Sequence, residues 1–246
     1  MSLCESSAAD FVGCVKWLHP LGNTLETWKL LRTGRALTLR GWVLLLAVCG
    51  ALASGLIGTV YPFLAVTAPV EANMLVVEGW APDFSMRAAI DEFRRRSYRE
   101  LIATGGPLEK GEPLSQYGDY AQIGRLTLER LGAPTGALHA VPAPKVKRDR
   151  TFSSAVALRK WLLQRGSLPE AINVITTDAH ARRTRLLFEK AFSGKTKIGI
   201  IAVPDERFDG SRWWRSSAGV RTVADELIAY LYSRFFFVVA DDLKEP

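Results

Sequence analysis

Short apolar runs rich in β-branched residues alternate with longer segments of helical periodicity from residue 71 onward. The runs are Met74–Val77, Leu101–Thr104, Ala137–Val141, Ile172–Thr176 and Ile198–Val203. Gly, Pro or Asp residues bound them, as is typical of buried strands. The segments expected to be helices are Phe84–Tyr98, Tyr117–Leu131, Phe152–Gln164, Ala179–Phe192 and Ala218–Phe237. This alternation predicts a three-layer, Rossmann-like α/β domain in which helices cover both faces of a parallel sheet of about five strands.

A stretch without any charged residue, Gly41–Val70, precedes this alternating pattern. Crossing the hydrocarbon core of a bilayer takes about 20 apolar residues, so the stretch is long enough to span a membrane. Forty residues precede it, which does not suit a cleaved signal peptide. We therefore expect one N-terminal transmembrane helix at residues 41–66.

The distribution of basic residues around this span predicts its orientation. Arg32, Arg35 and Arg40 lie just before the span, whereas no Lys or Arg occurs between Val70 and Met86. Cytoplasmic flanks of membrane helices carry the excess of Lys and Arg. Residues 1–40 are accordingly expected to form a cytoplasmic tail, and residues 71–240 an extracytoplasmic domain.

Composition narrows the class of protein further. Hydrophobic residues make up 48% of the 246 residues, which excludes a disordered chain. The three cysteines all precede residue 71, so a disulfide scaffold is excluded as well. A net charge of +7 favours anionic partners. Nucleic acid is not expected among them, because the basic residues are scattered without interleaved aromatic side chains.

The residues that follow the predicted strands are the candidates for ligand contact. Ligands of open parallel sheets bind outside the carboxyl ends of the strands. In chain order the candidates are Glu78, Gly79, Thr104, Gly105, Gly106, Arg150, Thr151, Thr177, Asp178, His180 and Arg183. Hydroxyl groups, glycine amides and guanidinium groups together can cradle a phosphate or an oxyanion. The alternative is that the glycine pair is simply a turn.

Two of these candidates suggest catalysis. His180 precedes a predicted helix, and Arg183 follows one turn later on the same face. We expect His180 to be a general acid or base, and Glu78 to orient it or a water molecule. A structural role for a single histidine is the competing interpretation. Dinucleotide, nucleophile-elbow and zinc motifs do not occur, so neither a cofactor nor a metal ion is expected.

Several short motifs, taken in order, resemble the SanA/ElyC/YdcF-type envelope proteins (domain of unknown function 218) over residues 72–230. The motifs are Val76-Val77-Glu78-Gly79, Arg87-Ala88-Ala89, Thr104-Gly105-Gly106, Leu131-Gly132-Ala133-Pro134, Arg150-Thr151 and Thr176-Thr177-Asp178-Ala179-His180-Ala181-Arg182-Arg183. The resemblance adds Arg87 to the ligand-binding candidates. An acidic residue that the family has after its glycine pair has two possible counterparts, Glu112 and Asp119. Phe152-Ser153-Ser154 replaces an acidic-Asn pair of the family.

The resemblance implies a location and a role. It implies a single-pass protein of the bacterial inner (plasma) membrane with a periplasmic domain, acting in peptidoglycan or cell-envelope polysaccharide metabolism. The expected ligand is a phosphorylated or lipid-carrier-linked precursor, and any chemistry would involve phosphoester or phosphoanhydride bonds. The alternative is a non-catalytic adaptor that holds envelope-assembly proteins. Trp213-Trp214 and Phe235-Phe236-Phe237 motivate that alternative, since exposed aromatic residues mark interfaces.

Overall fold

The computed structural model describes residues 38–109, 111 and 116–239. The chain divides into two compact units, Met1–Leu52 and Ala53–Pro246. Helix α2 (Leu39–Leu64) begins in the first unit and ends in the second. It has 26 residues and is long and apolar enough, by length and composition, to cross a membrane. Both of its ends lie two residues earlier than the predicted span 41–66.

The second unit contains a five-stranded sheet, as the sequence predicts. Its strands are β1 (Met74–Glu78), β2 (Glu100–Gly105), β3 (Leu138–Pro142), β4 (Ala171–Thr177) and β5 (Lys197–Val203). All neighbouring strands are parallel, in the order β3-β2-β1-β4-β5. The direction of winding reverses between β1 and β4, and such a switch point is where a doubly wound sheet leaves a crevice for ligands.

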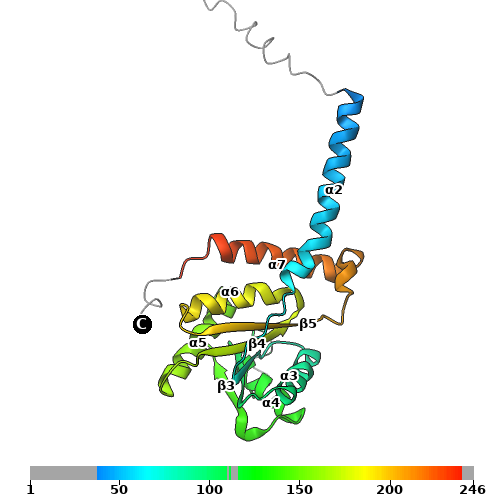
Figure 1. Cartoon of the computed structure of the whole chain (residues 1–246). Coiled ribbons are helices and arrows are strands. Elements are labelled where there is room, and N and C mark those ends of the chain that lie inside the picture. Colours follow the sequence, from blue (N-terminus) through cyan, green and yellow to red (C-terminus); the bar gives the residue numbers. More distant parts are fainter. Residues whose placement is uncertain (1–37, 110, 112–115, 240–246) are drawn as a thin grey trace, which may run out of the picture. The chain divides into compact units, whose positions relative to one another are not determined.

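Helices cover both faces of the sheet (Figure 1). One face carries α3 (Asp83–Arg95) and α4 (Tyr120–Arg130), and the other carries α5 (Arg150–Gln164) and α6 (Ala181–Phe192). Helix α7 (Ser217–Phe235) packs on α6. The 3-10 turns among the described residues are η2 (Thr135–Ala137), η3 (Asp178–His180) and η4 (Gly210–Arg215). The domain is therefore three-layered and Rossmann-like, with α7 outside one helical layer.

Side-chain alternation along the strands separates two hydrophobic cores. In β1, Leu75 and Val77 belong to the core under α3 and α4, whereas Val76 belongs to the core under α5 and α6. Successive side chains of a strand point to opposite faces, so this division follows from the strand itself. The same rule places Glu78 on the side of α5 and α6.

Several predicted boundaries differ from the structure, and two of the differences have clear local reasons. The predicted strand Ala137–Val141 begins one residue later, because Ala137 ends the turn η2. The predicted helix Ala179–Phe192 begins with the turn η3, and α6 follows from Ala181. Asp178 enters that turn in the left-handed region, with φ of 48°, which a continuous α-helix would not allow.

The segment after α2 is attached to the edge strand β5. Ala68 and Ile200 exchange backbone hydrogen bonds of 2.8 and 3.2 Å in an antiparallel bridge. Thr67 Oγ1 accepts a further bond from the Ala202 amide at 3.0 Å. This contact covers part of a strand edge that would otherwise present unpaired backbone groups.

Candidate functional site

A cavity of about 650 Å³ lies at the carboxyl edge of the sheet. Its wall is built from the segments that follow β1 and β2, the start of α5, the start of α6 and one side of α7. The polar and charged lining residues are Glu109, Tyr120, Lys147, Arg148, Asp149, Arg150, Thr151, Ser154, His180, Arg183, Glu226, Tyr232 and Ser233. Five predicted site residues, Gly106, Arg150, Thr151, His180 and Arg183, line it. Elements distant in sequence thus converge where the topology leaves space.

His180, Arg183 and Glu226 form a buried charged network on one wall of this cavity. Glu226 Oε1 lies 2.8 Å from His180 Nδ1. Arg183 donates to both oxygens of the same carboxylate, from Nε at 2.8 Å and from Nη2 at 3.0 Å. This bidentate contact fixes the guanidinium plane and, through the shared carboxylate, the imidazole ring.

Glu78 lies on the other side of the imidazole and does not line the cavity. Its carboxylate is 1% exposed and accepts hydrogen bonds from the hydroxyls of Thr176 and Thr184. One of its oxygens, Oε2, lies 3.5 Å from His180 Nε2. Glu78 therefore touches the histidine rather than the cavity.

The two carboxylates decide the charge of His180. Burial alone would lower the pKa of the imidazole, but Glu78 and Glu226 outweigh it and raise the pKa to about 9. Burial would likewise raise the pKa of Glu226, yet the adjacent His180 and Arg183 lower it to about 2. At neutral pH the cavity wall thus carries an imidazolium, which can donate a proton or a hydrogen bond but cannot accept a proton.

His180 is also confined by its apolar surroundings. It is 8% exposed, and the Trp80 ring meets it edge-on with centroids 5.0 Å apart. Among the described residues, His180 Nε2 has no hydrogen-bond partner, although Glu78 is within ion-pair distance. Nε2 therefore faces Glu78, on the side of the ring away from the cavity, and Nδ1 faces Glu226.

The N-terminus of α5 opens into the same cavity. Asp149 precedes the helix in the left-handed region, with φ of 59°, and its side chain does not cap the helix. The amides of the first helical turn have no partner within the helix and carry the positive end of the helix dipole. Arg150, in this turn, forms an ion pair with Glu109 that is more than half exposed on both sides. Thr151 is buried beside it.

The predicted glycines divide between two roles. A Cβ atom on Gly79 would lie 2.8 Å from the Tyr120 carbonyl carbon, and one on Gly105 would lie 2.7 Å from Tyr120 Cβ. Both glycines therefore allow α4 to approach the sheet, which is a packing role. Gly106 has no neighbour closer than 4.0 Å at that position and lines the cavity.

Further predicted residues lie outside the cavity wall. Thr104 is fully buried within β2, and Arg87 is exposed on α3. Thr177 Oγ1 lies 3.1 Å from Ser85 Oγ, on the α3 side of the sheet. Asp119 is the N-cap of α4 and accepts from the Gln122 amide at 2.8 Å. The alternative acidic candidate, Glu112, is outside the described residues.

Asp178 connects the end of β4 to the end of α2. Its carboxylate accepts a hydrogen bond of 2.5 Å from the Tyr61 hydroxyl. The position is 1% exposed, and burial raises the pKa of Asp178 despite that bond. Tyr61 thereby contacts the residue that lies two positions before His180, and Asp178 itself does not line the cavity.

Sequence reasoning missed Glu226, Trp80 and Tyr61. Glu226 is separated from Val223 and Tyr230 by three and four residues, and all three face the domain along α7. A carboxylate on the apolar face of a helix is the signal that indicates a buried ionic partner. Trp80 follows β1 directly. For Tyr61 the sequence holds no such signal, because an interfacial tyrosine is ordinary near the end of a membrane span.

The described residues contain no group of three His, Cys, Asp or Glu side chains arranged to hold a metal ion. Cationic side chains and helix amides face the cavity, and the imidazolium is held from behind by Glu78.

No known protein-family model matches this chain, and no curated protein matches it either.

Proposed function

We propose that the cavity binds the phosphate of a phosphorylated ligand. The observation that carries this proposal is the charge of the wall, where five cationic side chains face three carboxylates. The cations are Lys147, Arg148, Arg150, Arg183 and His180, and the carboxylates are Glu109, Asp149 and Glu226. An uncapped N-terminus of a 15-residue helix adds amide donors at the same place.

The cationic groups of the cavity wall have different roles. The guanidinium of Arg183 binds Glu226 through two hydrogen bonds, so Arg183 positions the histidine. Lys147 has no carboxylate partner among the described residues, and it is exposed at the cavity wall. An ammonium group without a partner attracts a phosphate as a point charge. Lys147 and the amides of α5 are accordingly the groups proposed to hold the anion.

The chemistry that this geometry supports is proton donation. Water would attack the phosphorus atom of a phosphoester or phosphoanhydride and lose its proton to a phosphate oxygen. The imidazolium of His180, turned so that Nε2 leaves Glu78, would give its proton to the departing oxygen as the P–O bond breaks. Glu78 and Glu226 keep His180 protonated until then. His180→Asn is expected to abolish any such turnover.

We further propose that the chain is anchored in the bacterial inner membrane with the domain in the periplasm. The apolar α2, the basic residues before it and the resemblance to SanA/ElyC/YdcF-type proteins support this location. The same resemblance supports a role in envelope biogenesis, around peptidoglycan or polysaccharide precursors. Reporter fusions after residue 75 test the orientation: alkaline phosphatase should be active and β-galactosidase silent, and the reverse pattern contradicts the proposal.

An adaptor that holds envelope-assembly proteins is the second candidate. It is favoured by the exposure of Phe235 and Phe236, at 71% and 73%. A Phe235→Ser, Phe236→Ser double variant should lose protein partners under this hypothesis while phosphate binding stays unchanged. Loss of function in cells from this variant, but not from His180→Asn, would favour the adaptor.

The binding experiment uses the full chain in detergent with inorganic phosphate and pyrophosphate as probes. Hydrogen bonds to charged groups contribute about 1.5–3 kcal/mol, so Lys147→Ala should weaken binding about tenfold or more. Arg185→Ala is the matched control, because Arg185 is exposed on α6 and pairs with Glu189. Equal affinity of both variants and the parent would overturn the cavity assignment.

A further inference from the structure

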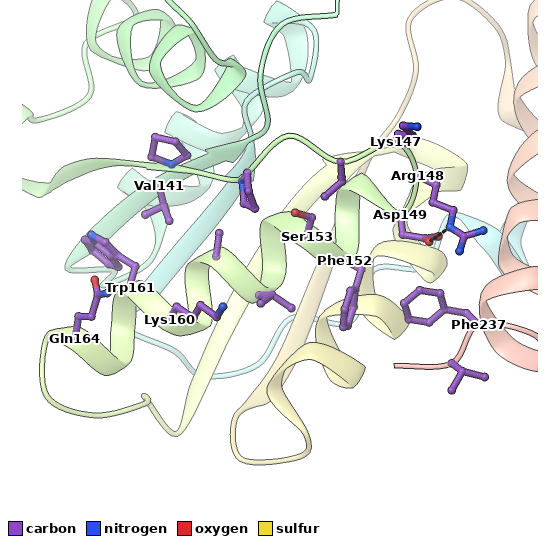
Figure 2. A pocket seen from close by; sticks show the side chains of 16 residues that line it. Val141, Lys147, Arg148, Asp149, Phe152, Ser153, Lys160, Trp161, Gln164 and Phe237 are labelled. Atoms are coloured by element: carbon purple, nitrogen blue, oxygen red, sulfur yellow. Dashed lines mark ion pairs between the residues drawn. The ribbon is translucent and has the colours of Figure 1, made fainter. Parts of the chain in front are cut away.

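A second, apolar groove of about 750 Å³ runs along the outer side of α5. Figure 2 shows Trp161 at one end of it, and the rings of Phe152 and Phe237 at the other. The apolar lining residues are Val141, Pro142, Pro144, Val146, Phe152, Val156, Ala157, Trp161, Phe237 and Val238. At 1.5 Å per residue, Phe152 and Trp161 are roughly 14 Å apart along the helix. The groove is thus elongated rather than round.

The groove and the anion cavity share a wall. Lys147, Arg148 and Asp149 line both of them, at the N-terminal end of α5. Figure 2 shows these residues beside the Phe152 end, with the ion pair of Arg148 and Asp149 drawn. A polar, cationic compartment and an apolar compartment are therefore continuous across one short segment.

Charge and polarity along this path match one kind of ligand. The cation-rich cavity suits an anionic head, and the exposed hydrocarbon of the groove suits an apolar tail. Val146 and Val238 are 38% and 79% exposed, so the groove wall presents apolar surface that a tail would remove from water. A soluble sugar phosphate or nucleotide would leave this surface uncovered.

We infer that the groove binds the hydrocarbon chain of an amphipathic phosphate whose head occupies the anion cavity. The ligand class is a single-chain lipid phosphate, with the phosphate against Lys147 and the chain running from Phe152 toward Trp161. This inference rests on the proposed function, because it assumes the phosphate site and specifies what is attached to the phosphate.

The test is a chain-length series on the full chain in nanodiscs, with empty nanodiscs as the blank. The probes are inorganic phosphate, butyl phosphate, hexyl phosphate and octyl phosphate, together with octanol. Each buried methylene is expected to tighten binding roughly fourfold. Octanol, which lacks the head, should bind far more weakly than octyl phosphate.

Two variants locate the chain in the groove. Ala157→Phe fills its middle, and Val238→Asp places a charge on its exposed rim, where the fold is not at stake. Both should flatten the dependence on chain length while the affinity for inorganic phosphate stays unchanged. Leu163→Phe is the matched control, since it adds a ring to the exposed part of α5 outside the groove. Thermal unfolding midpoints establish that each variant is folded.

The outcomes separate the two claims. Phosphate binding without any dependence on chain length overturns the groove inference and leaves the proposed function in place. A chain-length dependence that persists in both groove variants also overturns it. Failure of every phosphate probe to bind overturns the proposed function together with this inference. Chain-length dependence only in a variant that ends at Val239 would assign the groove to the chain's own last residues, and would overturn the lipid assignment.

Discussion

At the ends of β1 and β4, residues adjacent in sequence lie on opposite faces of the sheet and make different contacts. Thr176 donates to Glu78 and belongs to the charged network, whereas the next residue, Thr177, pairs with Ser85 of α3. In β1, Glu78 holds His180, and the next residue, Gly79, lets α4 approach. One face at this edge therefore carries the charged network, and the other face is closed by packing.

This difference shows that strand parity decides which candidate residues reach a site. Residues adjacent in sequence at the end of a strand point to opposite faces. At this edge, among the residues that the structure describes, only the face of α6 and α7 has carboxylates, an imidazole and a guanidinium in contact. A sequence motif at a strand end includes residues of both faces, whereas in the structure only the residues of one face belong to the site.

The largest expected effect is on the charged face. Glu226→Ala leaves His180 and Arg183 buried without their shared carboxylate. Removing one partner of a buried ion pair costs about 3–5 kcal/mol. Urea unfolding of the full chain in detergent should show a loss of that size. A loss below about 1 kcal/mol would mean that water reaches the charged network and that the network contributes little to stability.

The charged face should also make stability depend on pH. The pKa of His180 rises from 6.5 to about 9 on folding, so its contribution is fully present below pH 6.5 and is lost as the pH rises through 9. The pKa of Glu226 falls from 4.5 to about 2, so its contribution is present above pH 4.5 and is lost as the pH falls through 2. Between pH 6.5 and 9 the free energy of unfolding should drop by about 3 kcal/mol, at about 1.4 kcal/mol per pH unit.

His180→Asn should flatten that decline, and His139→Asn, which replaces the other described histidine, is the matched control. Unfolding midpoints measured at half-unit steps of pH would reveal the slope. A flat curve in the parent, or equal slopes in parent and His180→Asn, would contradict the ionisation assigned to the network.

On the packed face, an added methyl group should lower the stability of the protein. Gly79→Ala would press a methyl group against the Tyr120 carbonyl, and overpacking of this kind costs about 1–3 kcal/mol. Gly106→Ala has room and should stay within about 0.5 kcal/mol of the parent. If both variants lose the same stability, close packing does not explain Gly79.

The neighbouring threonines should differ in the size of their effects. Thr176→Val removes a hydrogen bond to a buried carboxylate, which contributes about 1.5–3 kcal/mol, whereas Thr177→Val removes a bond between neutral hydroxyls, which contributes about 0.5–1.5 kcal/mol. Only Thr176→Val should lower the pKa of His180, because it weakens the negative charge of Glu78 beside the ring. Only this variant should affect ligand binding. Identical behaviour of the two variants would undo the comparison between the faces.

Most of the fold could be predicted from the sequence, because β-branched runs and helical periodicity are local signals. The parallel order and the switch point follow from the alternation of strands and helices. The site was predictable only in part. His180, Arg150 and Gly106 reach the cavity because strand ends converge, but Glu226 comes from a helix that packs there through tertiary contacts. Neither spacing nor periodicity indicates which helix will cover a given strand end.

The central claim is that His180 is an imidazolium facing a phosphate site. Nitrogen-15 NMR of histidine-labelled full chain, titrated with and without inorganic phosphate, tests it most directly, with His180→Asn assigning the resonance. The account predicts a His180 titration near pH 9 that moves still higher when phosphate binds, since an anion beside the ring stabilises the charged form. A titration near pH 6.5 that phosphate leaves unchanged would contradict it.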